Sequence, residues 1–232
     1  MRIFVTPLAA GELTVHGDEH HYVMRVRRAR IGDAVELVDG EGHRAAATIT
    51  KITDSATTFS VSPPEAIPAA LPLVRVLVPL IKGDRMDTCL EKLVEVGADE
   101  IIVWPAARSV VKLDPDRRDA RIAKYQAAVV AASRQSGRAQ VPAVALANDL
   151  TSALKALPPG SRFVLDPTSD QPLTLDEAST DVTIVSGPEG GLAASELDAL
   201  LGFSAIGLGP RVLRAETAPI VAVALVRAAT RS

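Results

Sequence analysis

The sequence predicts an α/β domain, with a mainly parallel sheet and helices on its faces, preceded by a small β-barrel. Three observations predict it. Strand-like runs dominate residues 1–62, a proline-rich segment follows at 63–72, and apolar runs alternate with helical patterns over 73–232. A length of 232 residues fits one large domain or two smaller ones.

The first segment has β-branched residues at alternating positions, which is typical of half-buried strands. The expected strands are Val35–Val38, Ala45–Ile52 and Thr57–Val61. Asp18 is the expected N-cap of a short helix through His20 and His21. Adjacent histidines on a helix point about 100° apart, so a structural or surface role is favoured over metal binding.

The segment Ser62–Pro72 contains four prolines in eleven residues. Proline lacks a backbone N–H and interrupts both helix and strand, so residues 63–72 are predicted to form a stiff linker. The predicted division is a barrel over 1–62 and an α/β domain over 73–232.

The second segment alternates strand and helix patterns, as expected for parallel strands joined by helices. Its expected strands are Leu73–Leu80, Ile101–Trp104, Arg162–Leu165, Val182–Val185 and Ala205–Leu208. The expected helices are Asp84–Val96, a long one from Asp114–Pro115 to about Ser136, a short one capped by Ser195, and Ala218–Ala229 with Thr217 as N-cap. The last helix is apolar on all sides, so it is expected either in the core or partly against a second subunit.

Composition excludes several function classes. A single cysteine, Cys89, rules out an internal disulfide framework, and all four histidines precede the linker, so a Ser-His-Asp triad within the α/β domain is impossible. Neither a Walker-type phosphate loop nor G-x-G-x-x-G occurs. No metal is expected. No apolar stretch reaches 18 residues and the start has no signal-peptide pattern, so a soluble, cytoplasmic protein is expected.

Two glycine-bounded loops are the candidate ligand site. Ser186–Leu192 follows one expected strand and holds three glycines, and Leu208–Pro219 follows another and leads into the last helix. Glycines let the backbone approach a ligand closely. Ligands of parallel sheets bind where strands end, so the two loops are expected side by side. An ordinary strand-to-helix turn is the alternative for each.

Basic residues gather locally although the chain has a formal net charge of −3. Arg25–Arg30 holds four arginines, and Arg108–Arg138 holds eight basic residues against three acidic ones. One such run is typical of a solvated face, but two in separate domains favour a polyanionic partner. The candidate RNA-binding residues are Arg25, Arg27, Arg28, Lys82, Arg85, Lys112, Arg134, Gln135 and Arg138.

Four motifs occur together in the order of a known family. They are Lys82–Met86 (KGDRM), Gln135–Arg138 (QSGR), Gly187–Gly191 (GPEGG) and Leu208–Ala218, which contains LRAETA. The chain resembles the ribosomal RNA small subunit methyltransferase E family, of the SPOUT class of knotted methyltransferases. The resemblance covers nearly the whole chain.

The resemblance implies methylation of N3 of a uridine in 16S rRNA of the 30S subunit, with S-adenosylmethionine as methyl donor. It also implies a homodimer with the active site at the subunit interface, a C-terminal trefoil knot and an N-terminal PUA-like barrel. The cofactor-binding residues it implies are Leu165, Gly187, Pro188, Glu189, Gly190, Gly191, Leu208, Gly209, Leu213, Arg214, Glu216, Thr217 and Ala218.

The charged residues of the two loops are the candidate catalytic groups. N3 of uridine must lose a proton, so a base or a cation that stabilises the anion would help. The hypothesis assigns the cation to Arg214, and the proton acceptor, or a carboxylate that orients Arg214, to Glu189 or Glu216. For Glu216 the alternative is a helix-capping role.

Other functions stay open on sequence alone. They are methylation of another RNA site, a non-catalytic RNA-binding dimer, and an α/β enzyme acting on an anionic metabolite. Binding of S-adenosylhomocysteine would separate the methyltransferases from the rest.

Overall fold

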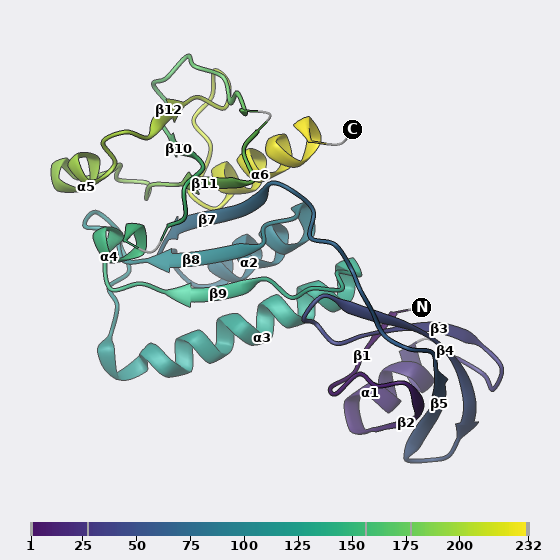
Figure 1. Ribbon diagram of the computed structural model, residues 1–232. Coiled ribbons are helices and arrows are strands. Elements are labelled where there is room, and N and C mark those ends of the chain that lie inside the picture. The colour runs from purple at the N-terminus through teal and green to yellow at the C-terminus, as the bar shows by residue number, and fades with distance from the viewer. Residues whose placement is uncertain (1, 27, 156, 177, 231–232) are drawn as a thin grey trace. The chain divides into compact units, whose positions relative to one another are not determined.

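The computed structural model describes residues 2–26, 28–155, 157–176 and 178–230, which form two compact units (Figure 1). The first unit contains the chain up to Ala69 together with Ser133–Val141, and the second contains Ala70–Ala132 and the chain from Pro142 onward. From its sequence pattern, Ser133–Val141 was expected in the α/β domain. The grouping of this segment with the first unit is a long-range feature that no local pattern indicates.

The first unit is built on one curved sheet. Its strand order is β1 (Arg2–Phe4), β3 (Ala34–Val38), β4 (His43–Ile52), β5 (Ala56–Val61) and β2 (Gly11–His16), with the short β6 (Glu65–Ala66) on β4. β1 runs parallel to β3, and the other pairs are antiparallel. Strands stand at the three expected positions, while β1, β2 and β6 were not predicted. β6 lies inside the segment 63–72 that was predicted to be a linker without a strand. Ile3, Leu37, Ile49 and Phe59 are fully buried in its core.

A short helix, α1 (Gly17–His21), continues into a π-helical turn over Tyr22–Val26. The prediction of Asp18 as N-cap was wrong, because the helix begins at Gly17 and its N-cap is His16. His20 is buried, and its Nδ1 lies 2.8 Å from the hydroxyl of Thr57. This contact ties α1 to β5 and gives His20 a structural position.

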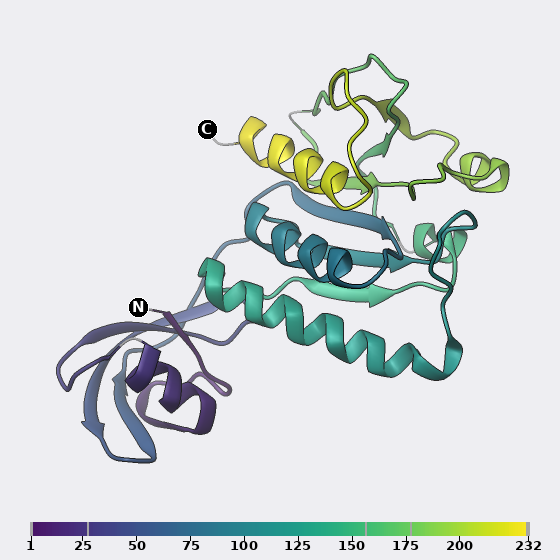
Figure 2. The ribbon, with the colours of Figure 1, turned by 180° about the vertical axis from the view of Figure 1, so that it is seen from behind.

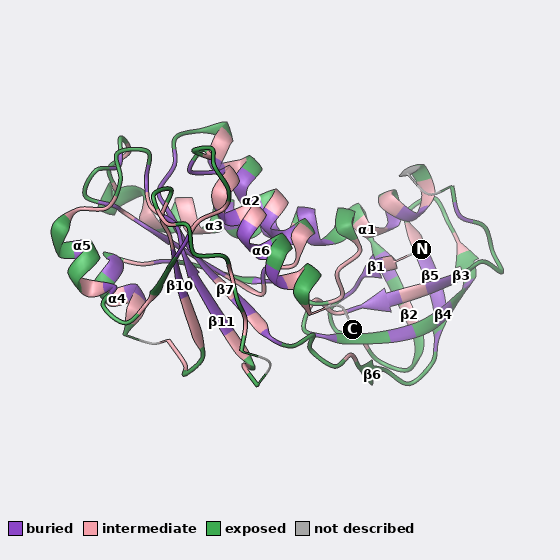
Figure 3. Cartoon of the chain, turned by 90° about the horizontal axis from the view of Figure 1, so that it is seen from above, coloured by how far each residue is buried: buried purple, intermediate pink, exposed green. Residues whose placement is uncertain are grey.

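The second unit contains a fully parallel six-stranded sheet. Its order is β12 (Ser204–Ile206), β10 (Ser161–Leu165), β11 (Asp181–Val185), β7 (Leu73–Pro79), β8 (Glu100–Trp104) and β9 (Ala143–Leu146). Five of these strands match expected apolar runs, and β9 was not predicted. Figure 3 shows the strands as largely buried, as expected for a sheet covered on both faces.

Helices cover the two faces of this sheet unequally. The helices are α2 (Asp84–Val96), the 3₁₀ turn Pro115–Arg117, α3 (Arg118–Ser136), α4 (Leu150–Leu154), α5 (Ala194–Ala199) and α6 (Thr217–Ala229). α2 and α6 lie side by side over one face (Figure 2), where α6 packs on β7 and β11. On the other face, Leu150 of α4 and Leu200, just after α5, share a core with Trp104.

The helix boundaries follow the sequence patterns closely at α2 and less so elsewhere. α2 buries Met86, Cys89, Leu90, Leu93 and Val94, the apolar positions that predicted it. Two cap predictions were wrong. Ser195 lies inside α5, whose N-cap is Ala193, and Thr217 lies inside α6, whose N-cap is Glu216.

Among the described residues, no helix is long and apolar enough to cross a membrane.

Candidate functional site

A cavity of about 430 Å³ lies where β10, β11 and β12 end in the second unit. These three strands are parallel neighbours, so their carboxyl ends meet at one edge and the loops that follow them converge. We call this cavity the strand-end pocket. Its lining consists of Val164, Leu165, Asp166, Pro167, Ser186, Gly187, Pro188, Glu189, Gly191, Leu192, Leu197, Ala205, Ile206, Leu208, Gly209, Arg211, Val212, Leu213, Ala215 and Ala218.

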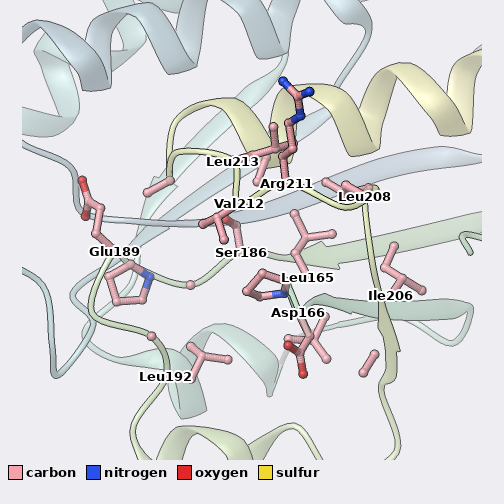
Figure 4. A pocket seen from close by; sticks show the side chains of 18 of the residues that line it. Leu165, Asp166, Ser186, Glu189, Leu192, Ile206, Leu208, Arg211, Val212 and Leu213 are labelled. Atoms are coloured by element: carbon pink, nitrogen blue, oxygen red, sulfur yellow. The ribbon is translucent and has the colours of Figure 1, made fainter. Parts of the chain in front are cut away.

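The two glycine-bounded loops of the sequence analysis meet in this pocket. Most of the lining side chains are apolar, among them Leu165, Leu192 and Ile206 (Figure 4). In the same view the Arg211 side chain points away from this apolar group toward α6. An apolar cavity with a few polar groups at its edge is typical of a small-molecule site.

Backbone packing sets the shape of the pocket. A Cβ atom on Gly207 would lie 1.9 Å from the carbonyl oxygen of Ser169, so only glycine permits this approach of β12 to the loop after β10. The Gly207 N–H donates to the carbonyl of Gln171 at 2.9 Å. On the loop Ser186–Leu192, Gly191 adopts φ +73° and its N–H donates to Pro188 O at 2.9 Å, closing a tight turn. The cavity therefore depends on glycines as much as on side chains.

Most residues expected to bind a cofactor line this pocket. They are Leu165, Gly187, Pro188, Glu189, Gly191, Leu208, Gly209, Leu213 and Ala218. Four others, Gly190, Arg214, Glu216 and Thr217, are absent from the lining. Asp166 lines it without having been predicted, whereas Ser186 and Arg211 line it from within the two predicted loops but were not named as cofactor-binding residues. The position of Asp166 and Ser186 directly after expected strands was a signal that could have found them.

An ion-pair network connects the two loops, and of its members only Glu189 lines the pocket. Arg85, in the first turn of α2, places a guanidinium nitrogen 2.7 Å from a Glu189 carboxylate oxygen and 3.6 Å from Oε2 of Glu216. Arg214 lies 3.9 Å from the other oxygen of Glu216. Arg85, predicted to contact RNA, thus lies between two carboxylates.

The members of this network differ in exposure. The Arg214 side chain is 76% exposed and that of Glu189 is 42% exposed, whereas that of Glu216 is only 12% exposed. Among the described residues, Oε2 of Glu216 has no hydrogen-bond partner. Burial raises the pKa of the Cys89 thiol to about 12, and the nearby Glu216 charge makes a smaller contribution in the same direction. This side of the loops is therefore poorly hydrated, while Arg214 is open to solvent.

A buried carboxylate fixes the opposite side of the glycine loop. Glu196 accepts hydrogen bonds from the backbone N–H groups of Ala107 and Ala193, both at 2.7 Å. The segment that carries Ala107 places Arg108 against the loop, where its guanidinium donates to Gly190 O at 3.3 Å. The sequence did not indicate this role for Glu196, because its partners are distant along the chain.

The candidate RNA-binding residues are divided between the units. Arg25, Arg28, Arg134, Gln135 and Arg138 belong to the first unit, and Lys82, Arg85 and Lys112 to the second. Arg25, Arg28, Lys82, Lys112, Arg134 and Gln135 are exposed. Arg27 lies outside the described residues. Across the described chain, no group of three His, Cys, Asp or Glu side chains could hold a metal ion.

Comparison with known families defines the class of protein. The family described as RNA methyltransferase domain matches residues 69–227, and the RNA methyltransferase PUA domain family matches residues 15–61. The two matches correspond to the parallel sheet with its pocket and to the small curved sheet. Fold and site together thus define an RNA methyltransferase domain with an N-terminal PUA domain.

Individual relatives identify the family within this class. The chain is 33% identical to ribosomal RNA small subunit methyltransferase E of Mycobacterium bovis over 91% of this chain and 84% of the relative. It is 29% identical to the protein of the same name from Bacillus subtilis, over 94% of this chain and 90% of the relative. The chain belongs to the ribosomal RNA small subunit methyltransferase E family.

A solved structure agrees with this assignment. The ribosomal RNA small subunit methyltransferase E from Neisseria gonorrhoeae, solved bound to S-adenosyl methionine, is 28% identical and matches with a TM-score of 0.84. The match covers 98% of this chain and 97% of that one. The similarity therefore includes both units of the chain.

Proposed function

We propose that this chain transfers the methyl group of S-adenosylmethionine to N3 of a uridine in 16S rRNA of the small ribosomal subunit. The observation that carries the proposal is the strand-end pocket, which two glycine-bounded loops form in a chain of this family. A relative of similar fold has been solved with S-adenosyl methionine. The target lies in the cytoplasm, so we also propose a cytoplasmic location.

The residues of the pocket fit this cofactor. A cavity of about 430 Å³ falls within the range of roughly 300–1,000 Å³ that is usual for small-molecule sites. The apolar lining suits an adenosine, and the carboxylates of Asp166 and Glu189 suit a ligand with a cationic sulfonium. A Cβ atom on Gly187 would lie 3.2 Å from the Leu192 side chain, so a larger residue there would crowd the lining.

The chemistry needs few groups from the protein. When bound, the cofactor supplies a methyl group that its sulfonium already activates. The exposed guanidinium of Arg214 stabilises the negative charge that develops on the uracil ring, and the buried carboxylate of Glu216 positions Arg214. Glu189, held by Arg85, accepts the proton from N3. The electron pair left on N3 forms the new bond to the methyl carbon while the carbon–sulfur bond breaks, and the electron pair of that bond stays on the sulfur of the departing S-adenosylhomocysteine.

The proposed roles follow the domains expected from the sequence, except that Ser133–Val141 groups with the first unit. Residues 1–62 act as a PUA-like RNA-binding domain, residues 63–72 as a linker, and residues 73–232 as the methyltransferase domain. The exposed arginines Arg25 and Arg28, together with Arg27 and Arg138, contact RNA phosphates in the first unit, as Lys82 and Lys112 do in the second.

The remaining features of the proposal are a knot and a homodimer. α6 follows the edge strand β12 yet packs on β7 and β11 near the middle of the sheet, which supports a C-terminal trefoil knot. The outer side of α6 is apolar, with Ala224 and Leu225 exposed. This supports a homodimer that buries α6, with the active site at the subunit interface.

Two measurements test the proposed function. Calorimetry with S-adenosylhomocysteine should detect binding, and purified chain should methylate 30S subunits from a strain that lacks the modification. Replacing Arg214 with Ala should lower kcat by about 10²-fold or more, as loss of a transition-state donor does. Binding of RNA without binding of S-adenosylhomocysteine would support the non-catalytic alternative, and methylation at another nucleotide would support another RNA site.

A further inference from the structure

The first unit contains a cavity of its own, of about 310 Å³. We call it the Arg134 pocket. It is lined from β1, α1, the π-helical turn and the last turn of α3, by Arg2, Ile3, Phe4, Asp18, Glu19, His21, Tyr22 and Arg134. All these residues belong to the first unit, and none of them lines the strand-end pocket.

Arg134 is held in place on two sides. Its guanidinium carbon lies 5.6 Å from the centroid of the Phe4 ring, a cation–π distance, and one of its nitrogens donates to the carboxylate of Glu19. The side chain nevertheless remains 45% exposed. A flat, fixed and accessible guanidinium is a surface on which an aromatic base can stack.

The charges of the pocket are balanced. The lining contains two arginines, Arg2 and Arg134, and two carboxylates, Asp18 and Glu19. The charge of Arg2 is also compensated by Glu36, because Arg2 Nε lies 2.5 Å from a carboxylate oxygen of Glu36. A phosphate would be repelled by the carboxylates about as strongly as the arginines attract it. A neutral ligand that offers both donors and acceptors suits this wall better than an anion.

Among the RNA bases, guanine presents the matching pattern. Its N1–H and N2–H donors stand side by side on one edge and suit a carboxylate, while its flat ring suits stacking on the Arg134 guanidinium. Adenine places an acceptor where guanine has N1–H, so a carboxylate would repel it. Burial raises the pKa of Glu19 in spite of the nearby Arg134, so its carboxylate is poorly solvated and would gain from new donors.

We propose that the Arg134 pocket binds an unpaired guanine of the RNA substrate, with Glu19 reading its Watson–Crick edge and Arg134 stacking on its ring. The inference rests on the proposed function in one respect, since it takes RNA as the substrate. It adds a base-specific contact to the first unit, which the exposed arginines cannot provide because phosphate contacts carry no sequence information.

Fluorescence anisotropy with two labelled hexanucleotides tests the proposal. One probe is oligouridine with a single central guanine, and the other has adenine at that position. The native chain should bind the guanine probe about tenfold more tightly, within the range usual for one bidentate contact. Glu19→Gln should bring the ratio to about one, because one carboxylate oxygen becomes an NH₂ donor.

Matched variants separate recognition from folding. Glu12→Gln makes the same change on β2 at an exposed position outside the pocket, and should keep the preference. Arg134→Lys keeps the charge but loses the planar surface, so it should weaken both probes several-fold. Binding of S-adenosylhomocysteine, which uses the other unit, should be unchanged in all three variants and reports that the chain is folded.

Each outcome decides for or against the proposal. Equal affinity for the two probes would overturn it, as would a preference that persists in Glu19→Gln. Equal affinity combined with competition by inorganic phosphate would show that the pocket binds the backbone instead. If the native chain did not bind S-adenosylhomocysteine, the proposed methyl transfer would be contradicted. The guanine preference would still stand as an independent result.

Discussion

The two pockets of this molecule are built in different ways. Loops that follow parallel strands shape the strand-end pocket, with glycines at the close contacts and apolar side chains on the walls. Two arginines and two carboxylates dominate the Arg134 pocket, together with Phe4 and Tyr22. In the first, specificity depends on where the backbone lies, and in the second it depends on which charged atoms face the ligand.

This difference has consequences that can be tested. Where the backbone shapes a pocket, ligand affinity should fall when a substitution adds volume and should change little with salt concentration. A pocket of charged side chains should tolerate changes of shape but respond to loss of a charge.

The largest expected effect concerns Cys89, which is buried on α2. Its pKa of about 12 against an ordinary 9.0 lowers the thiolate fraction at pH 8 about a thousandfold. The native thiol should therefore not react with Ellman's reagent at pH 8, whereas chain unfolded in guanidinium should react at once. Since the folded-state pKa is raised, the stabilising contribution of the neutral thiol is present below pH 9 and is lost as the pH rises through about 12. Rapid reaction in the native state would show that this region is open to water.

The next effect is that of Gly207→Ala. The added Cβ would lie 1.9 Å from Ser169 O, so the backbone must move and the pocket must change shape. Such overpacking costs about 1–3 kcal/mol, which corresponds to roughly ten- to hundredfold weaker S-adenosylhomocysteine binding by calorimetry. Gly202→Ala is the control: an alanine at its φ of +90° is strained, but no atom lies within 4 Å of the new Cβ. If both variants bound equally well, close approach at Gly207 would not shape the pocket.

Arg85→Ala should have an intermediate effect. Without Arg85, the carboxylates of Glu189 and Glu216 lose the cation between them, and kcat should fall about tenfold while cofactor affinity changes little. Arg85→Lys should recover part of the loss. A raised KM for 30S subunits at unchanged kcat would instead indicate that Arg85 contacts RNA directly, as the sequence had suggested.

The smallest effect is expected for Arg28→Glu in the first unit. Arg28 is exposed, and RNA affinity should fall several-fold at low salt, with a shallower dependence on salt concentration by about 0.7 per lost phosphate contact. Lys51→Glu reverses an exposed charge on β4 of the same unit and serves as control. Cofactor binding should change in neither variant, since the strand-end pocket lies in the other unit. A similar loss in both would mean that only net charge matters.

The sequence predicted the strand-end pocket because its signals are local. The glycines of 187–191 and the segment from Leu208 follow apolar strand patterns directly, and in a parallel sheet such ends must meet. It could not predict Glu196 as the anchor of Ala107, nor the close approach of Gly207 to Ser169, because both depend on partners distant along the chain.

The same limit explains what was missed in the first unit. Arg134 was predicted as an RNA contact from the charge of its segment. Its position beside Phe4 and Glu19 requires the end of α3 to group with the first unit, which no helical periodicity encodes. Charge patterns thus indicated the type of partner, while the pocket itself appeared only in three dimensions.

The position of Trp104 provides a spectroscopic probe. It is the only tryptophan of the chain, is fully buried at the end of β8, and shares its core with Leu192, which lines the strand-end pocket. Its emission therefore reports the second unit alone. Unfolding of the first unit would be silent in tryptophan fluorescence, so a fluorescence melt compared with a circular dichroism melt would resolve the two units without any label.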